Sequence, residues 1–311
     1  MDRNLTHCVR FILLLICLAG SLEIVGQTRS ASQFRTVTIT TEPNASVWID
    51  GVLYGSTGES GTLEVRTVSA GAHSLRVRAP GYKEITRPIT AAQRGAIKVD
   101  LVKTSDEAEL AFQEGERLST VDRDRAADAY RKALKLKPSY PEAHLALGRV
   151  LSDAGDLDEA KKAVAAARRL RPGYAEASAV EGRIHKEYGD IEKAVTTFQR
   201  AITEGKGFQP EAYTGLGLLY KEKAEGAGGS GDFDQEAEHY AEAQKYLRTA
   251  LKQLAGAPDA SVIYQLLGLI YERQKMYPEA IALYEEFLRI FPESNDATAV
   301  RSFIVQLKKD Q

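Results

Sequence analysis

The sequence has very little cysteine. Only Cys8 and Cys17 occur among its 311 residues, and both lie in a hydrophobic segment near the N-terminus. Everything that follows this segment has no thiol, which excludes a disulfide framework, a thiolate zinc site and a cysteine nucleophile there. Because exported bacterial proteins often lack disulfides, this absence is compatible with export.

The chain also lacks an excess of charge of one sign. Its 41 Lys and Arg residues nearly balance its 43 Asp and Glu residues, so the formal net charge is −2. Such a balance creates no basic field that would draw the whole molecule to nucleic acid or to an anionic membrane. We therefore predict no nucleic-acid partner.

Motifs of common catalytic and cofactor sites are missing as well. The sequence has no phosphate-binding loop, no Gly-x-Ser-x-Gly elbow and no His-Glu-x-x-His helix. Its five histidines, at positions 7, 73, 144, 185 and 239, are scattered and form no metal-ligand pattern. We predict no catalytic residue, no cofactor and no metal site, and we expect the protein not to be an enzyme.

The N-terminal segment has the features of a signal peptide. Arg3 and Arg10 precede an apolar run over residues 11–18, and small residues follow it. The run is too short to cross a hydrocarbon core of about 30 Å. We therefore predict a signal peptide over residues 1–27 and a protein that is exported, either periplasmic or associated with the cell envelope.

Two alternatives for this segment stay open. If the apolar span continues through Leu22 and Val25, past Glu23, the segment is an uncleaved anchor and the protein's only membrane contact. If Cys17 is lipidated, the protein is a lipoprotein, although the bulky Ile16 precedes that cysteine where a small residue is usual.

Between residues 34 and 103, apolar residues alternate with polar ones. Val37 and Ile39 lie between threonines, and turn residues such as Asp50-Gly51 and Pro80-Gly81 separate the runs. Similar runs follow at residues 47–49, 75–77 and 97–101. Because successive side chains of a strand face opposite sides, this pattern predicts short strands with one buried face. We predict a small antiparallel β-sandwich.

Short motifs in this segment resemble those of the PEGA domain. They are Pro-Asn-Ala-Ser-Val-Trp-Ile-Asp-Gly at 43–51, Gly-Ser-Thr at 55–57, Ala-Gly-Ala-His-Ser-Leu-Arg-Val at 70–77 and Pro-Gly-Tyr at 80–82. The resemblance covers the whole segment and departs only at Gly58, where the family usually has proline. It implies a non-catalytic β-sandwich module of bacterial and archaeal surface or exported proteins.

Three residues of this segment are candidates for a ligand site. His73 fits the family's Gly-x-His pattern, and we expect it to be a strand-surface residue. Trp48 and Tyr54 have the side chains of an aromatic sugar-binding platform, although ordinary cross-strand packing is the favoured interpretation.

From residue 106 onward, glycine and alanine recur at a nearly constant spacing. Glycines at 115, 148, 182, 217 and 268 are 33, 34, 35 and 51 residues apart, and alanines at 126, 160, 194, 243 and 280 follow the same period. Apolar residues at helical spacing surround both series, so each unit is predicted to be two amphipathic helices. We predict five units over residues 106–294 and a capping helix over 295–311. A Gly-rich insertion at about 224–235 interrupts the fourth unit, and its composition predicts a flexible loop.

These units resemble the tetratricopeptide repeat (TPR). The resemblance rests on Tyr213-x-x-Leu216-Gly217-x-x-Tyr220, on Tyr264-x-x-Leu267-Gly268-x-x-Tyr271, and on Ala126-x-x-x-Tyr130 and Ala280-x-x-x-Tyr284. Phe287 departs from the family, which has a small residue there. The resemblance implies an all-α superhelix, or solenoid, in which the first helix of each unit lines a concave surface that binds a protein or peptide partner.

Carried over position by position, the resemblance assigns partner-binding residues to this surface. They are Arg149, Arg183, Lys186, Leu218, Lys221, Leu269 and Arg273, with Glu116, Thr120, Leu145, Ser152, Thr214 and Gln265 beside them. The middle of the set is basic, which gives the hypothesis of a groove for an acidic or C-terminal peptide, held by forked arginine contacts. Interleaved glutamates leave an alternative open, in which these charges are solvated and neutralised locally.

The sequence therefore predicts a multi-domain α and β protein that is a non-enzymatic exported scaffold or adaptor. Its TPR array would bind a protein partner at the cell envelope, and its β module would contact cell-wall or envelope material or space the array from the membrane. The alternative is a structural or glycan-binding envelope protein, in which the β module binds the ligand and the repeats mediate assembly.

Overall fold

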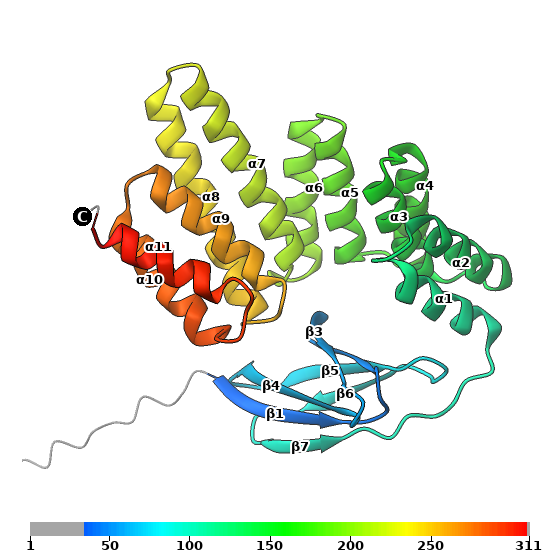
Figure 1. Ribbon diagram of the computed structural model, residues 1–311. Coiled ribbons are helices and arrows are strands. Elements are labelled where there is room, and N and C mark those ends of the chain that lie inside the picture. The colour runs from blue at the N-terminus through cyan, green and yellow to red at the C-terminus, as the bar shows by residue number, and fades with distance from the viewer. Residues whose placement is uncertain (1–33, 310–311) are drawn as a thin grey trace, which may run out of the picture. The chain divides into compact units, whose positions relative to one another are not determined.

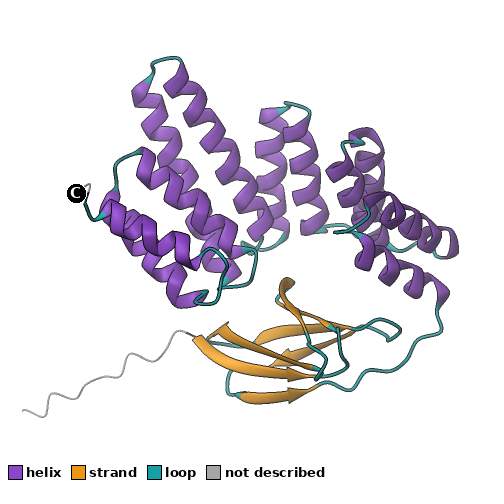
Figure 2. Cartoon of the chain, viewed as in Figure 1, coloured by secondary structure: helices purple, strands orange, loops and turns teal. Residues whose placement is uncertain are grey.

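The computed structural model describes residues 34–309, so the predicted signal peptide and its two alternatives lie outside the described residues. Figure 2 shows strands in the N-terminal part of this range and helices in the rest. The predicted fold class, a small β-sandwich followed by an all-α superhelix, is confirmed. All described residues belong to one compact unit.

The strands of residues 34–309 form two sheets. The first has the order β4-β1-β7, with β1 at Phe34–Thr40, β4 at Thr62–Ser69 and β7 at Gly95–Lys98. The second has the order β3-β2-β5-β6, with β2 at Ser46–Ile49, β3 at Val52–Ser56, β5 at His73–Arg78 and β6 at Ile85–Ile89. Neighbouring strands are antiparallel except β1 and β7, which pair in parallel.

The sandwich core consists of the alternating residues that the sequence pattern identified. Val37, Ile39, Leu75 and Val77 are completely buried between the two sheets. Gly55 lies inside β3. The register of β2 and β3 shifts beside Gly55, whose φ is +132°, so the glycine accommodates a bulge within the strand.

The helical part contains five helix pairs and a final single helix within the described residues (Figure 1). Each helix packs against its partner in the pair, and each pair packs against the next. The pairs are α1 (Glu107–Leu118) with α2 (Arg123–Leu136), α3 (Pro141–Ala154) with α4 (Leu157–Leu170), α5 (Ala175–Glu187) with α6 (Ile191–Glu204), α7 (Pro210–Gly229) with α8 (Phe233–Leu254), and α9 (Ala260–Arg273) with α10 (Tyr277–Ile290). The single helix α11 (Ala297–Leu307) packs against α10.

The recurring glycine marks the closest approach of the two helices in each pair. A Cβ atom on Gly148 would lie 2.6 Å from Val164 Cγ2, and one on Gly217 would lie 2.5 Å from the Cγ of Leu247. Both distances are far below van der Waals contact, so any side chain at these positions would wedge the helices apart. The period near 34 residues therefore reflects a packing requirement that each unit repeats.

The Gly-rich insertion is helical, so the prediction of a flexible loop is wrong. Helix α7 has 20 residues and continues to Gly229, and α8 has 22 residues and begins at Phe233. Only Ser230–Asp232 lie between them, and the Asp232 carboxylate caps α8 by accepting a hydrogen bond from the Gln235 amide. The additional turns of α7 and α8 pack along each other, with Ala224 completely buried. This tertiary packing outweighs the low helix propensity of glycine.

Arg78 at the end of β5 joins the sandwich to the first helix of the array. Its side chain is 7% exposed, and its guanidinium pairs with Glu84 and Glu116 and lies 4.0 Å from Glu109. The same guanidinium lies 4.7 Å from the ring centroid of Phe112. Burial raises the pKa of the Glu116 carboxyl, although Arg78 opposes this shift. One buried cation thus connects three carboxylates from two parts of the chain.

Gln113 of α1 adds a second connection to the sandwich. Its side-chain amide donates a hydrogen bond to the Tyr82 carbonyl, and its Oε1 accepts one from the Gly81 amide, each at 2.8 Å. Because Gln113 is buried, both hydrogen bonds are shielded from water. The sandwich and the first helix pair therefore form a continuous packed structure.

Candidate partner-binding surface

The basic residues assigned to the concave surface lie on the first helices of successive pairs, and each has an acidic partner. Arg149 pairs with Glu211 at 2.5 Å, Arg183 with Asp153 at 3.2 Å, Lys186 with Glu222 at 2.7 Å, Lys221 with Glu225 at 2.6 Å and Arg273 with Glu236 at 3.2 Å. The acids come from the array itself. The structure therefore brings the predicted basic residues into a row whose charges are neutralised internally.

The Arg149–Glu211 pair has the longest reach of these contacts. It connects α3 with the N-terminal end of α7, so it spans the intervening α5. Burial lowers the pKa of Arg149, but the Glu211 carboxylate, with smaller contributions from Tyr174 and Glu176, raises it, so the net shift is upward. This pair ties alternate repeats together, which is a structural role that the sequence pattern did not reveal.

The other residues assigned to the surface differ in how accessible they are. Leu145 and Ser152 are buried, so a partner cannot reach them. Thr120 lies beyond the end of α1, in the turn before α2. Leu218 is half-buried, whereas Leu269 is among the most exposed large apolar residues of the described chain.

The aromatic pair of the sandwich is used in packing. Trp48 on β2 is directly opposite Arg76 on β5, and the Arg76 guanidinium lies 4.2 Å from the centroid of the indole ring. The Tyr54 hydroxyl donates a hydrogen bond to the Leu254 carbonyl at 3.3 Å. Burial, together with the nearby Asp50 carboxylate, raises the pKa of Tyr54 to about 12. Trp48 therefore packs across strands, as the favoured interpretation has it, whereas Tyr54 contacts the C-terminal end of α8.

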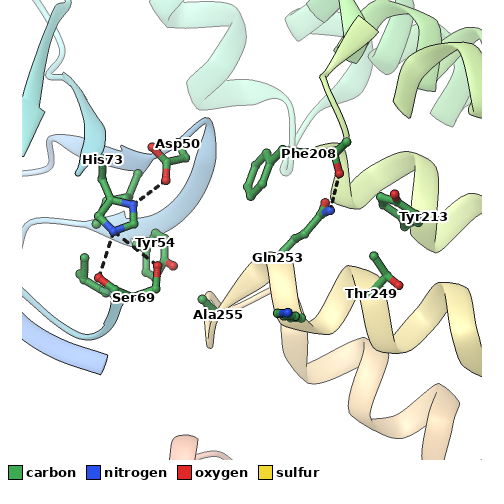
Figure 3. Close-up of a pocket in the computed structure, with 13 residues that line it drawn as sticks. Asp50, Tyr54, Ser69, His73, Phe208, Tyr213, Thr249, Gln253 and Ala255 are labelled. Carbon is green, nitrogen blue, oxygen red and sulfur yellow. Dashed lines mark hydrogen bonds and ion pairs between the residues drawn. The ribbon is translucent and has the colours of Figure 1, made fainter. Parts of the chain in front are cut away.

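His73 lines a cavity of about 360 Å³, together with residues of the helical array (Figure 3). Its side chain is only 9% exposed, so the expectation of a strand-surface histidine is wrong. The His73 Nδ1 lies 2.6 Å from the Asp50 carboxylate, and its Nε2 lies 3.0 Å from the Ser69 carbonyl oxygen. These two contacts connect β5 with the turn after β2 and the end of β4.

The same residues superficially resemble the Asp-His-Ser arrangement of hydrolases. The Ser69 hydroxyl lies 3.4 Å from His73 Nε2, farther than the Ser69 carbonyl oxygen. The main-chain carbonyl oxygen is thus the nearer partner of Nε2, and the 3.4 Å to the hydroxyl is longer than the hydrogen bond that joins an activated serine to its base. The geometry therefore differs from that of a catalytic triad.

Replacing Tyr54 with phenylalanine tests the contact between the sandwich and the array at this cavity. The change removes one half-buried hydrogen bond and leaves the ring in place, so we expect the free energy of unfolding to fall by about 1 kcal/mol. Urea unfolding followed by circular dichroism measures this change. Tyr213→Phe is the matched control, because Tyr213 lines the same cavity and its hydroxyl has no hydrogen-bond partner within the described residues. Equal losses in both variants would contradict a specific Tyr54 bond.

Within residues 34–309 no three His, Cys, Asp or Glu residues cluster closely enough to hold a metal ion. None of the helices described there combines the length and the apolar composition that crossing a bilayer requires.

Comparisons with protein families match three segments of the chain. A PEGA domain model matches residues 34–105, and tetratricopeptide repeat models match residues 112–184 and 222–293. The chain contains a PEGA domain followed by TPR repeats. Both predicted resemblances are thereby confirmed. Because stacked TPR units provide extended surfaces for binding other proteins, the helical part is a protein-interaction scaffold.

Solved structures with a similar fold are TPR proteins and their assemblies. Yeast Tom70 is 19% identical with a TM-score of 0.51, and the match covers 67% of this chain and 41% of Tom70. A thermophilic TPR protein of Thermus thermophilus is 20% identical with a TM-score of 0.48 over 64% of this chain and 98% of that one. The Cut9–Hcn1 match is 20% identical with a TM-score of 0.49 over 65% of this chain, and it spans 36% of that protein's length. The Tom70 similarity shows a shared fold alone, and a comparison with curated proteins gave no match.

Proposed function

We propose that this protein is a non-enzymatic, exported scaffold whose TPR array binds a protein partner at the cell envelope. One observation carries the proposal: the same repeat position recurs as a row on the first helices of the pairs, of which α3, α5 and α7 contact one another in turn. The row includes Glu116, Arg149, Arg183, Leu218 and Leu269, which follow the period of the glycines. A long row of this kind suits an extended polypeptide better than a small substrate, which binds in a concave pocket.

Export and an envelope location are supported by the N-terminal hydrophobic run and by the PEGA domain. In this proposal the sandwich holds the array at the envelope, and the array faces the partner. Fractionation of cells that express the full-length chain tests the location. We expect the chain in the periplasmic or envelope fraction, and recovery with cytoplasmic markers would contradict export.

The internal ion pairs change the kind of partner that we propose. An acidic peptide would have to displace Glu211 from Arg149 and Asp153 from Arg183 before it gained any contact. Since the array already supplies these counter-charges, an incoming acid gains little by replacing them. We therefore propose that the five basic residues line the surface but are not its main source of affinity for the partner. They are Arg149, Arg183, Lys186, Lys221 and Arg273.

Site-specific photo-crosslinking tests the proposed surface. A benzophenone amino acid at Gln265, which is exposed on α9, should form a covalent adduct with a protein partner in cells of the native host. The same amino acid at Lys161, exposed on the second helix α4, is the control and should give little adduct. Adducts from position 161 alone would contradict a partner on the first helices, and adducts from neither position would contradict the scaffold proposal.

A further inference from the structure

The row of equivalent positions changes character along the array. It begins with Glu116, Arg149 and Arg183 and continues with Leu218, Leu269 and Val305, at spacings of 33, 34, 35, 51 and 36 residues. The three charged members each have an ion-pair partner, since Glu116 pairs with Arg78 of the sandwich. The apolar members cannot form ion pairs, and the side chains of Leu269 and Val305 are largely exposed to solvent. The C-terminal half of the surface therefore differs chemically from the N-terminal half.

Val305 belongs to this row because α11 is placed like the first helix of a sixth unit. The residues of α11 that pack inward are Val300, Ile304 and Leu307. They lie 36 residues after Tyr264, Gly268 and Tyr271, which are the buried residues of α9 at the same repeat positions. Gln265 of α9 also donates a hydrogen bond at 3.2 Å to Asp296, which immediately precedes α11. The face of α11 that carries Val305 thus continues the face of α9 that carries Leu269.

Three apolar side chains on this face are unusually exposed, and we call them the apolar strip. Val262 is 54% exposed, and Leu269 and Val305 are each 56% exposed. Val262 and Leu269 are seven residues apart on α9, so they lie on one side of that helix. Single exposed apolar residues are common, but several on one continuous face indicate a surface that another molecule covers.

A cation without an internal partner lies beside the strip. Arg301 is exposed and comes four residues before Val305, one turn away on the same face of α11. Within residues 34–309 its side chain has no ion pair or hydrogen bond, in contrast to the five basic residues assigned to the concave surface. The nearby Asp296 accepts its hydrogen bond from Gln265, and Lys308 on α11 pairs with Glu285. Arg301 is therefore the charge that remains available to a partner here.

We propose that the apolar strip binds a peptide segment of the partner with aliphatic or aromatic side chains next to an acidic residue. The apolar side chains would cover Val262, Leu269 and Val305, and the acidic residue would pair with Arg301. This inference rests on the proposed scaffold function and assigns its partner a chemical class. A second copy of the chain fits less well, because a two-fold contact through this narrow strip would bring two Arg301 side chains into one patch.

Selection of short random peptides on the full-length protein tests the proposal. Peptides that the wild-type protein retains should combine apolar residues with Asp or Glu, and their dissociation constants are then measured by fluorescence polarisation. The double variant L269S/V305S should weaken binding about tenfold or more, because it removes two apolar contacts. Arg301→Glu should weaken the same peptides by about threefold to tenfold through the lost ion pair. Val121→Ser is the control, since Val121 is 75% exposed in the turn after α1, and it should change the affinity less than about twofold.

Each result that differs from these expectations would contradict a different part of the proposal. Unchanged affinity in L269S/V305S, with a native circular dichroism spectrum, overturns the apolar strip and leaves the scaffold function standing. A selection dominated by basic peptides overturns the role of Arg301. Failure of the wild-type protein to retain any peptide overturns the scaffold proposal as well. Wild-type dimers in light scattering that dissociate in L269S/V305S assign the strip to a second copy and overturn the peptide proposal.

Discussion

Replacing Gly182 with alanine should lower the free energy of unfolding by about 2 kcal/mol, although alanine is the better helix former. The added Cβ would lie 2.7 Å from Cδ1 of Phe198, on the facing helix α6. Phe198 cannot move aside, because its ring is almost completely buried and also contacts Gly215. The overpacking cost therefore exceeds the gain in helix propensity. Urea unfolding monitored by circular dichroism measures the change.

The matched control is the same substitution at Gly226 in α7. Gly226 is exposed and helical, and a Cβ there would have no neighbour within 4 Å. Only helix propensity then matters, so Gly226→Ala should raise the free energy of unfolding by about 0.5–1 kcal/mol. The two variants should differ in sign. A stabilising Gly182→Ala would contradict the argument that the repeat period reflects helix approach at this glycine.

Replacing Arg78 with methionine should lower the free energy of unfolding by about 3 kcal/mol near pH 7. The change keeps an apolar stem of similar length and removes the cation that Glu84, Glu109 and Glu116 share. Removing one partner of a buried ion pair costs about 3–5 kcal/mol of unfolding free energy. We expect the lower end of this range, because the Glu84 and Glu116 side chains remain 29% and 33% exposed. Arg66→Met is the control. Arg66 pairs with Glu64 on the surface of the same sandwich with 74% exposure, so its loss should leave the free energy of unfolding close to that of the wild type.

The effect of Arg78→Met should also depend on pH in a defined direction. Burial raises the pKa of Glu116 in the folded protein, and Arg78 opposes that shift, so removing Arg78 raises it further. A carboxyl with a raised folded pKa favours the folded state at low pH and loses this contribution as the pH rises through the folded pKa. The deficit of Arg78→Met relative to wild type should therefore shrink as the pH falls toward about 4. A deficit that is constant between neutral and acidic pH would contradict the role of Glu116.

The sequence predicted the architecture well wherever residues at regular intervals along the chain have the same structural environment. Val37 and Ile39 alternate because one sheet face is buried, and Gly148 and Gly182 recur because facing helices touch there. Periodicity was less informative for the insertion. Glycine-rich composition indicated a loop, whereas the packing of α7 along α8 maintains helices as far as Gly229. Tertiary contacts decided that segment, and composition does not contain them.

The candidate surface was predictable in position more than in chemistry. The repeat placed Arg149 and Arg183 on the correct helices, but their pairing with Glu211 and Asp153 depends on how the pairs stack. The sequence distance of 62 residues between Arg149 and Glu211 gives no hint of that contact. Val305 was missed, although the spacing of 36 residues from Leu269 was a usable signal. It follows once α11 is recognised as the first helix of another unit.

Calorimetric titration of a selected peptide into the full-length protein at several temperatures tests the central claim most directly. If the array is a scaffold that covers its apolar strip with a partner segment, one peptide should bind per chain. The heat-capacity change should then be negative because apolar surface is buried, and the affinity should depend weakly on salt. A heat-capacity change near zero, with an affinity that falls steeply as salt rises, would contradict the strip and favour binding by the charged row. Absence of binding to the wild-type protein would contradict the scaffold itself.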